Sequence, residues 1–154
     1  MDASAIQQLL IDGIPLARFI GLQVDEVGPG MVRLHMPFTP NTQNHLGTAY
    51  AGGIFSLAEL AGGVLLVSSF DPAQHLMLAR RLEIEYLHPG RGTLSCAPRL
   101  PDDLVAETRA TIAQQGKADL SLSIEVMDAD GEVVARVQAT YYLRRQSVTH
   151  QDAG

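Results

Sequence analysis

Hydrophobic and polar positions along the chain change their period several times, and each change marks an element. Apolar residues over 4–12 recur at helical spacing, and Gly13 followed by Pro15 ends that pattern, so a short N-terminal helix is predicted over 4–12. Further along the chain the period becomes two, which predicts strands near 21–27 and 30–37.

The next part of the chain holds a loop and then an apolar helix. Residues 37–48 are rich in Pro, Asn and Thr, have no period and are predicted to form a loop of functional length. Residues from about 50 to 69 are apolar or small apart from one charge, Glu59, which predicts a buried central helix. This stretch is nearly long enough to span a bilayer, but its four glycines and its central carboxylate argue against a membrane span.

Strict alternation returns after the helix and continues to about residue 145. The apolar residues from Leu76 to Tyr86 share one parity, and the segments 120–126 and 133–141 alternate in the same way. This pattern indicates one antiparallel sheet with one solvated face. We predict four long strands in this part of the chain, with connections at 88–92, 99–103, 114–117 and 128–132.

Together these elements predict an α+β protein with the hot-dog layout, in which a long central helix is wrapped by an antiparallel sheet of five to six strands. The length of 154 residues fits one domain, which we expect to cover 1–145. The polar residues 146–154 are expected to form a flexible C-terminal tail.

Charge and cysteine content narrow the classes of partner and cofactor. The net charge is −6 and no basic run could neutralise a phosphate backbone, so no nucleic acid partner is expected. Cys96 is the one cysteine, which excludes an intrachain disulfide and a two-cysteine redox pair. The histidine spacings suit no metal site, so we expect neither a metal nor a redox cofactor. The N-terminus lacks the cationic start of a secretory signal, and we expect a cytoplasmic protein without membrane association.

Glu59 is the most informative position for chemistry. An ionised carboxylate in an apolar helix costs several kcal/mol unless a partner, a solvated cavity or a proton compensates for its burial. One interpretation is structural, in which Glu59 caps backbone or pairs with Arg80 or Arg81 at a subunit contact. The other makes Glu59 a general base or a nucleophile.

The residues before Glu59 favour the second interpretation. A loop containing Gly47, Ala51 and Gly52 lets another group approach the backbone closely, and the start of a helix presents free N–H groups that stabilise negative charge on an oxygen. Glu59 lies two turns later, roughly 10 Å or more from those amides. A second subunit would supply the missing partner, which predicts a homodimer and allows a dimer of dimers.

The segment GTAYAGGIFSLAE, preceded by Asn44, and the later run EIEYLHPGRGTL resemble the hot-dog acyl-CoA thioesterases over about residues 14–145. The resemblance is greatest to the phenylacetyl-CoA branch and to a thioesterase domain that follows an acetyltransferase domain in certain bacterial proteins. The branch has His-Gly-Gly where this chain has Tyr50-Ala51-Gly52, so a phenol replaces a histidine donor. The resemblance implies hydrolysis of a small or medium acyl-CoA, or of an acyl-carrier thioester.

The same resemblance implies a role for each site residue. Asn44 would orient or polarise the thioester carbonyl, the amide of Ala51 or Gly52 would form the oxyanion site, and Glu59 of the facing subunit would attack the carbonyl or activate water. Tyr50 would donate one hydrogen bond. The residues expected to bind the substrate, by shaping the cavity or holding the coenzyme A phosphates, are Gly47, His45, Phe55, Leu60, Tyr86, Arg81 and, preferred among several arginines, Arg91.

Two alternatives of other classes stay open. His45 precedes Glu59 by 14 positions, the separation found in hot-dog dehydratases that act on 3-hydroxyacyl thioesters and use the two groups as acid and base. The Phe-Pro-Gly after that histidine and the Pro-Gly that opens the helix are missing here, and the other interpretation of His45 is a hydrogen-bonding loop residue. In the second alternative the cavity binds acyl groups or lipids without catalysis.

Overall fold

The computed structural model describes residues 2–146, in which six strands form one antiparallel sheet in the order β1-β2-β4-β5-β6-β3. The helices are α1 (Ala3–Gly13), α2 (Pro15–Phe19), α3 (Ala51–Ser69) and α4 (Asp102–Gln115). The strands are β1 (Gln23–Gly28), β2 (Met31–Met36), β3 (His75–Tyr86), β4 (Leu94–Cys96), β5 (Lys117–Met127) and β6 (Val133–Arg145).

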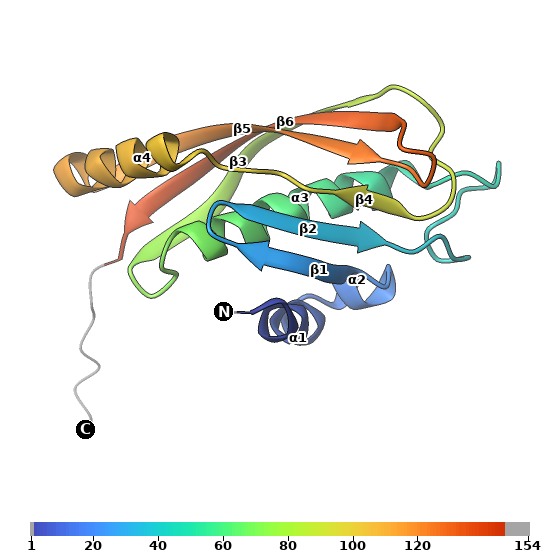
Figure 1. The fold of residues 1–154 in the computed structure, drawn as a ribbon, viewed down its shortest axis with the longest axis horizontal. Coiled ribbons are helices and arrows are strands. Elements are labelled where there is room, and N and C mark those ends of the chain that lie inside the picture. Colours follow the sequence, from blue (N-terminus) through green and yellow to red (C-terminus); the bar gives the residue numbers. More distant parts are fainter. Residues whose placement is uncertain (1, 147–154) are drawn as a thin grey trace.

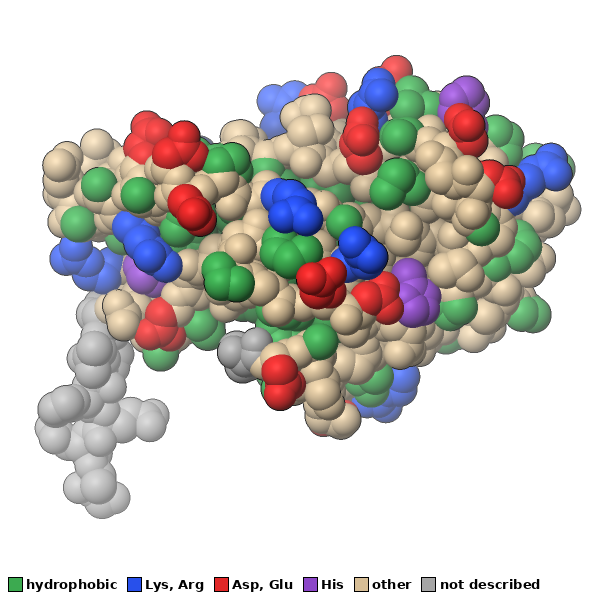
Figure 2. Space-filling view, in the orientation of Figure 1, with side chains coloured by type: hydrophobic (Ala, Val, Ile, Leu, Met, Phe, Trp, Pro, Cys, Tyr) green, Lys and Arg blue, Asp and Glu red, His purple; other side chains and the backbone are tan. Residues whose placement is uncertain are grey.

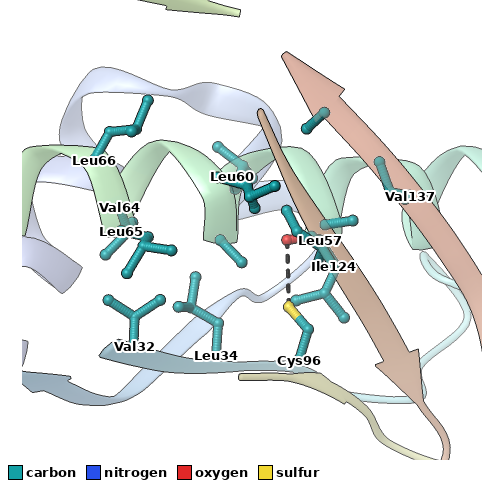
Figure 3. Close-up of a cluster of buried hydrophobic side chains, with 14 of the residues drawn as sticks. Val32, Leu34, Leu57, Leu60, Val64, Leu65, Leu66, Cys96, Ile124 and Val137 are labelled. Atoms are coloured by element: carbon teal, nitrogen blue, oxygen red, sulfur yellow. Dashed lines mark hydrogen bonds between the residues drawn. The ribbon is translucent and has the colours of Figure 1, made fainter. Parts of the chain in front are cut away.

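The sheet curves around α3, which lies along its concave face (Figure 1). Leu65 of α3 lies against Val32 and Leu34 of β2, and all three side chains are fully buried (Figure 3). On another side of α3 the Sγ of Cys96 lies 3.7 Å from the carbonyl oxygen of Leu57 (Figure 3). The core is therefore the space between one helix and one wrapped sheet, and the predicted hot-dog layout is confirmed.

α3 is long and apolar enough to cross a membrane by length and composition alone. However, 56% of the most apolar 18-residue window of this helix is buried inside the fold. Its apolar side chains therefore pack against the sheet that wraps it, as in the core helix of a globular domain. The helix runs over Ala51–Ser69, against a prediction of about 50–69, and α1 extends one residue beyond the predicted 4–12 at each end.

A helix stands in a part of the chain for which only strands and connections were predicted. α4 begins after Pro101, carries Asp102 and Asp103 in its first turn, where carboxylates interact favourably with the helix dipole, and ends at Gly116 with φ of 77°. Its buried side chains follow helical spacing and pack on the end of the sheet. The prediction of four long strands after the central helix is wrong in this respect, and also because β4 is only three residues long.

The side chains that lie on the same face of β3 are not those that were predicted to do so. Its register against β6 shifts beside Arg80, and this bulge inserts one residue and reverses the facing of the strand. Leu82 pairs with the buried Ala139 and faces the core. Leu78 pairs with Tyr142 on the outer face and is 51% exposed. The single apolar face predicted for this strand is therefore wrong.

Charged side chains on the face shown in Figure 2 are interspersed, with acidic and basic groups alternating over short distances and no extended basic patch. The exposed outer side of the strands also carries cross-strand pairs, such as Arg80 with Asp119 and Arg136 with Glu125. Such exposed pairs contribute little to stability.

Candidate active site

The loop before α3 is held in place by a few backbone hydrogen bonds. The Thr42 carbonyl accepts from the Tyr50 amide at 2.9 Å, and the buried Thr42 hydroxyl donates to the Pro37 carbonyl at 2.8 Å. The Ala49 amide donates to the Gly90 carbonyl at 3.0 Å, which ties this loop to the connection between β3 and β4. These contacts fix the first turn of α3 relative to the sheet.

Asn44 makes hydrogen bonds within this loop through both the nitrogen and the oxygen of its side-chain amide. Its Nδ2 donates to the Thr48 hydroxyl at 2.9 Å, and its Oδ1 accepts from the amides of Leu46 at 2.9 Å and Thr48 at 3.2 Å. Gly47, with φ of 70°, completes the turn by donating from its amide to the Asn44 carbonyl. Asn44 thus shapes the loop in the isolated protomer, and its contact with a substrate carbonyl stays a prediction.

The start of α3 presents unused backbone donors. Within residues 2–146 the amides of Ala51, Gly52 and Gly53 have no hydrogen-bond acceptor, as expected for the first turn of a helix. Ala51 lies in the wall of a cavity of about 300 Å³, together with Asn44, Tyr86 and the residues of the β3–β4 connection. The Tyr86 hydroxyl donates to the Ala51 carbonyl at 2.9 Å and so ties this first turn to β3.

Tyr50 caps this helix with its backbone only, because its side chain makes no capping hydrogen bond. The ring is 56% exposed and lies beside Gly52, where a Cβ atom would come within 2.6 Å of it. Burial raises the pKa of the Tyr86 phenol, and the nearby Tyr50 phenol raises it further by a smaller amount. The Tyr50 hydroxyl is therefore accessible at the helix end, and its catalytic part stays a prediction.

Glu59 opens into a different cavity, of about 340 Å³, between α1, α3, β3 and β6. The remaining walls are almost wholly apolar and come from Ile6, Leu9, Leu10, Gly13, Ile14, Leu60, Gly63, Val64, Leu66, Val67, Met77, Ala79 and Tyr141. Burial raises the pKa of the Glu59 carboxyl above its usual value. The carboxylate is half-buried, and it faces space large enough for a ligand rather than solid packing.

No cation among the described residues pairs with this carboxylate. Arg80 pairs with Asp119 at 2.8 Å, and Arg81 pairs with Glu83 at 3.0 Å. Among the described residues Glu59 makes no ion pair and no side-chain hydrogen bond. The structural interpretation, an ion pair with Arg80 or Arg81, thus has no support within one chain.

The two cavities share no lining residue, so the protomer does not bring Glu59 to the free amides. Ala51 and Glu59 are separated by eight residues of one helix, a rise of roughly 12 Å. The structure thus contains two incomplete halves of the predicted site, one at the start of α3 and one at its middle.

Only some of the other predicted residues lie at one of these halves. Leu60 is buried in the wall of the Glu59 cavity, and Phe55 is half-buried one turn before Glu59. His45 is exposed on the loop and lines neither cavity. Arg91 is exposed on the β3–β4 connection, next to the residues that line the Ala51 cavity, whereas Arg81 lies in neither wall.

Two contributors to the Glu59 cavity were not anticipated from the sequence. α1 supplies one wall through Ile6, Leu9 and Leu10, together with Ile14 just after it, although it was predicted only as a short helix. Tyr141 supplies another from β6, where it was counted as one apolar position of an alternating strand. An alternation pattern tells which residues face the core but not which face a hollow in it.

Cys96 is inert in this arrangement. It is fully buried in β4, and burial raises the pKa of its thiol far above the usual value, so it has little thiolate character. Among residues 2–146 no three His, Cys, Asp or Glu side chains gather in a way that could hold a metal ion.

The raised pKa of Glu59 predicts a pH-dependent cost of folding. The pKa of this carboxyl is higher in the folded protein than in the unfolded chain, where it is near 4.5. Its contribution to the free energy of unfolding is therefore fully present at pH values below the unfolded pKa, and it is lost as the pH rises through the folded pKa. We therefore expect Glu59→Gln to match the wild type in free energy of unfolding near pH 4 and to exceed it at pH 7. Urea unfolding across this range is the measurement, and a stability difference that stays constant with pH would contradict the prediction.

Residues 3–143 match the family model described as a domain of unknown function, DUF4442. The match covers almost the whole of the described fold. This protein belongs to the DUF4442 family.

This DUF4442 protein is also similar to several solved structures and to a curated protein. A Pseudomonas aeruginosa protein of unknown function, PA5026, provisionally described as a thioesterase, is 33% identical with a TM-score of 0.86 and covers 93% of this chain and 96% of its own. A Halobacterium salinarum protein provisionally named an esterase, VNG_1336C, is 29% identical over 85% of this chain and 84% of its own. The Haemophilus influenzae thioesterase HI1161, at 13% identity, a TM-score of 0.74 and coverage of 98% and 96%, shares the fold. The resemblance to hot-dog thioesterases is thus confirmed.

Proposed function

We propose that this DUF4442 protein is a thioesterase that hydrolyses a small or medium acyl-CoA to the free acid and the thiol. The observation that carries the proposal is the Glu59 carboxylate, half-buried and without a cation, at the edge of an otherwise apolar cavity. A carboxylate kept in such a place at a cost in stability is typical of a functional group. Hydrolysis of esters or thioesters also agrees with the names of PA5026 and VNG_1336C.

The chemistry assigns one task to each half of the site. The carbonyl oxygen of the thioester lies at the Ala51 amide, where the start of α3 stabilises the negative charge that develops on it. Glu59 of the facing protomer attacks the carbonyl carbon or removes a proton from the water that does so. In the general-base route the C–S bond breaks and the thiolate takes the proton that Glu59 removed from water. In the direct route the C–S bond breaks to leave an anhydride between Glu59 and the acyl group, which a water molecule hydrolyses to the free acid, with a proton of that water passing to the thiolate. Either route needs Glu59 in its ionised form.

The cavity beside Glu59 suits the acyl group. Its volume of about 340 Å³ holds roughly ten heavy atoms if each takes about the space of one water molecule. The walls supplied by α1, α3 and β3 contain no charged group other than Glu59 itself. An apolar acyl chain of small or medium length therefore fits the space, and Leu9 of α1 and Ile14, the residue after α1, define its outer limit.

A homodimer is part of this proposal, because only a second protomer can bring an Ala51 amide to Glu59. The sheet supports pairing, since β1 and β3 are its two edges and β3 presents exposed apolar side chains such as Leu78. Arg91 stands next to the Ala51 cavity, where it could bind a phosphate of coenzyme A.

Two neighbouring glycines of α3 are expected to respond to substitution in opposite directions. Gly63 has nothing within 4 Å of an added Cβ atom, so Gly63→Ala should raise the free energy of unfolding by about 0.5–1 kcal/mol through helix propensity. A Cβ atom at Gly62 would overlap the Tyr141 hydroxyl, so Gly62→Ala should lower the free energy of unfolding by about 1–3 kcal/mol. Urea unfolding measures both variants.

Gly63→Ala should also narrow the cavity beside Glu59. We expect kcat/KM to fall more for the longest acyl chain that the wild type accepts than for acetyl-CoA. Equal effects on all chain lengths would contradict the assignment of this cavity to the acyl group.

Release of thiol from a panel of acyl-CoAs tests the proposed function. We expect release of coenzyme A, followed with a thiol-reactive dye, with a preference for chains that fit the cavity. Consumption of an enoyl or 3-hydroxyacyl thioester without thiol release would instead indicate a dehydratase that uses His45. Saturable acyl-CoA binding without any conversion would indicate a binding protein.

A further inference from the structure

Tyr141 carries a hydroxyl group that the fold buries without giving it a partner. The residue is 1% exposed, and its hydroxyl is the one buried side-chain polar atom within residues 2–146 that makes no hydrogen bond. Leaving such a group unpaired costs about 1–3 kcal/mol, whereas a phenylalanine would fill the same space without that cost. Because buried hydroxyl groups are normally hydrogen-bonded, we expect this one to have a hydrogen-bond acceptor in the functional protein.

α3 is shaped to admit this hydroxyl. Gly62 lies directly under it, and even an alanine there would overlap the oxygen atom. Gly62 is three residues after Glu59, so it lies on the neighbouring turn of the same side of the helix. The absence of a side chain at Gly62 thus brings the phenol against α3 next to the carboxylate.

Tyr141 and Glu59 face the same cavity. They are the two titratable residues in its wall, since α1 contributes only apolar side chains and glycine and β3 contributes Met77 and Ala79. The charge on Glu59 raises the pKa of Tyr141 further, after the larger effect of burial, and the buried Cys96 adds a smaller effect. Tyr141 thus stays protonated at neutral pH, where its hydroxyl can donate a hydrogen bond to the ionised Glu59.

We infer that Tyr141 is a positioning residue whose hydroxyl donates a hydrogen bond to the ionised Glu59 carboxylate when the Glu59 side chain turns toward it. In the structure the two residues line one cavity without a hydrogen bond between them, and the open space of about 340 Å³ beside Glu59 gives its side chain room to turn. The bond orients the carboxylate toward the reacting carbon of the proposed hydrolysis and favours its charged form. The inference rests on the proposed function for its catalytic meaning, but the hydrogen bond can be tested separately.

The test is an NMR titration of the Glu59 side-chain carboxyl in protein labelled with ¹³C-glutamate, with the signal assigned by its loss in Glu59→Gln. A neutral donor stabilises the charged form, so its removal in Tyr141→Phe should raise the pKa of Glu59, by about one pH unit. Tyr142→Phe is the matched control, because Tyr142 is the next residue of β6, lies on the opposite face of the sheet and lines no part of this cavity. It should leave the pKa of Glu59 unchanged.

The acidic limb of the kcat/KM profile for thioester hydrolysis should move in the same direction in Tyr141→Phe. A Glu59 pKa that is unchanged or lower in folded Tyr141→Phe overturns the inference, and urea unfolding verifies the fold. If the wild type hydrolyses no thioester, the proposed function fails, while the titration still decides whether the two side chains are linked.

Discussion

Glu59→Gln is expected to lower kcat/KM for thioester hydrolysis by about 10²–10⁴-fold, the range observed when a positioned acid–base group is removed. Gln has nearly the same shape as Glu but can neither accept a proton from water nor attack a carbonyl at neutral pH. Because Glu59 makes no ion pair or side-chain hydrogen bond among the described residues, the substitution breaks no structural contact there. Activity should therefore fall while the fold and the oligomeric state are kept.

Glu107→Gln is the matched control for this experiment, because Glu107 is exposed on α4 and lies in neither cavity wall. It should hydrolyse the same acyl-CoA at the wild-type rate. Steady-state kinetics with the thiol-reactive dye, together with gel filtration and circular dichroism, give the comparison. Full hydrolysis by a folded Glu59→Gln protein would refute the role of this carboxylate.

The activity of the wild type should also depend on pH through Glu59. Burial raises the pKa of this carboxyl, and its ionised form is the active one, so kcat/KM should rise with pH and level off above that raised pKa. The acidic limb thus reports the same ionisation that the NMR titration measures, and the two values should agree.

The parts of the fold that could be predicted from the sequence are those in which local pattern and burial agree. The 50–69 segment is apolar on all sides, and the structure surrounds that helix with the sheet, so its assignment needed no knowledge of neighbours. The alternating segments of β5 and β6 lie in the middle of the sheet with one face on α3, which gives the clearest period of two.

The parts that were missed depend on contacts distant in sequence. α4 buries only Val105, Thr108 and Ile112, so its apolar stripe is too weak to stand out, although Pro101 and Gly116 mark its ends. The bulge beside Arg80 shows no signal in the chain itself, because it is defined by the register against β6. A sequence pattern cannot reveal such a register shift.

The candidate site shows the same division. Glu59 stands out because one charge in an apolar helix violates the local pattern, and such violations are typical of functional positions. Tyr141 violates nothing, since a tyrosine is an ordinary residue for a strand. Only the structure shows that its hydroxyl is unpaired and lies over Gly62.

Ala51→Pro is expected to lower kcat for thioester hydrolysis by about 10²–10³-fold, the usual effect of losing one donor to an oxyanion. Ala51 is the first residue of α3, a position where proline fits a helix and removes only an N–H that is otherwise free. Tyr50 before it is extended, with φ of −69° and ψ of 131°, as a residue preceding proline should be. The variant thus removes one donor without disturbing the helix, and wild-type kcat in a folded Ala51→Pro protein would show that this amide is not the oxyanion donor.

Combining Ala51→Pro with Glu59→Gln in one dimer tests whether the site is shared. If Glu59 of one protomer acts on a carbonyl held by Ala51 of the other, a heterodimer of the two inactive variants has one intact site and one doubly defective site. Heterodimers purified through two different tags should then recover about half of the wild-type activity. If each site lay within one chain, each protomer would still carry one of the two substitutions, so both sites would stay defective and no activity would return. The separation of Ala51 and Glu59 by roughly 12 Å along α3 favours the shared site.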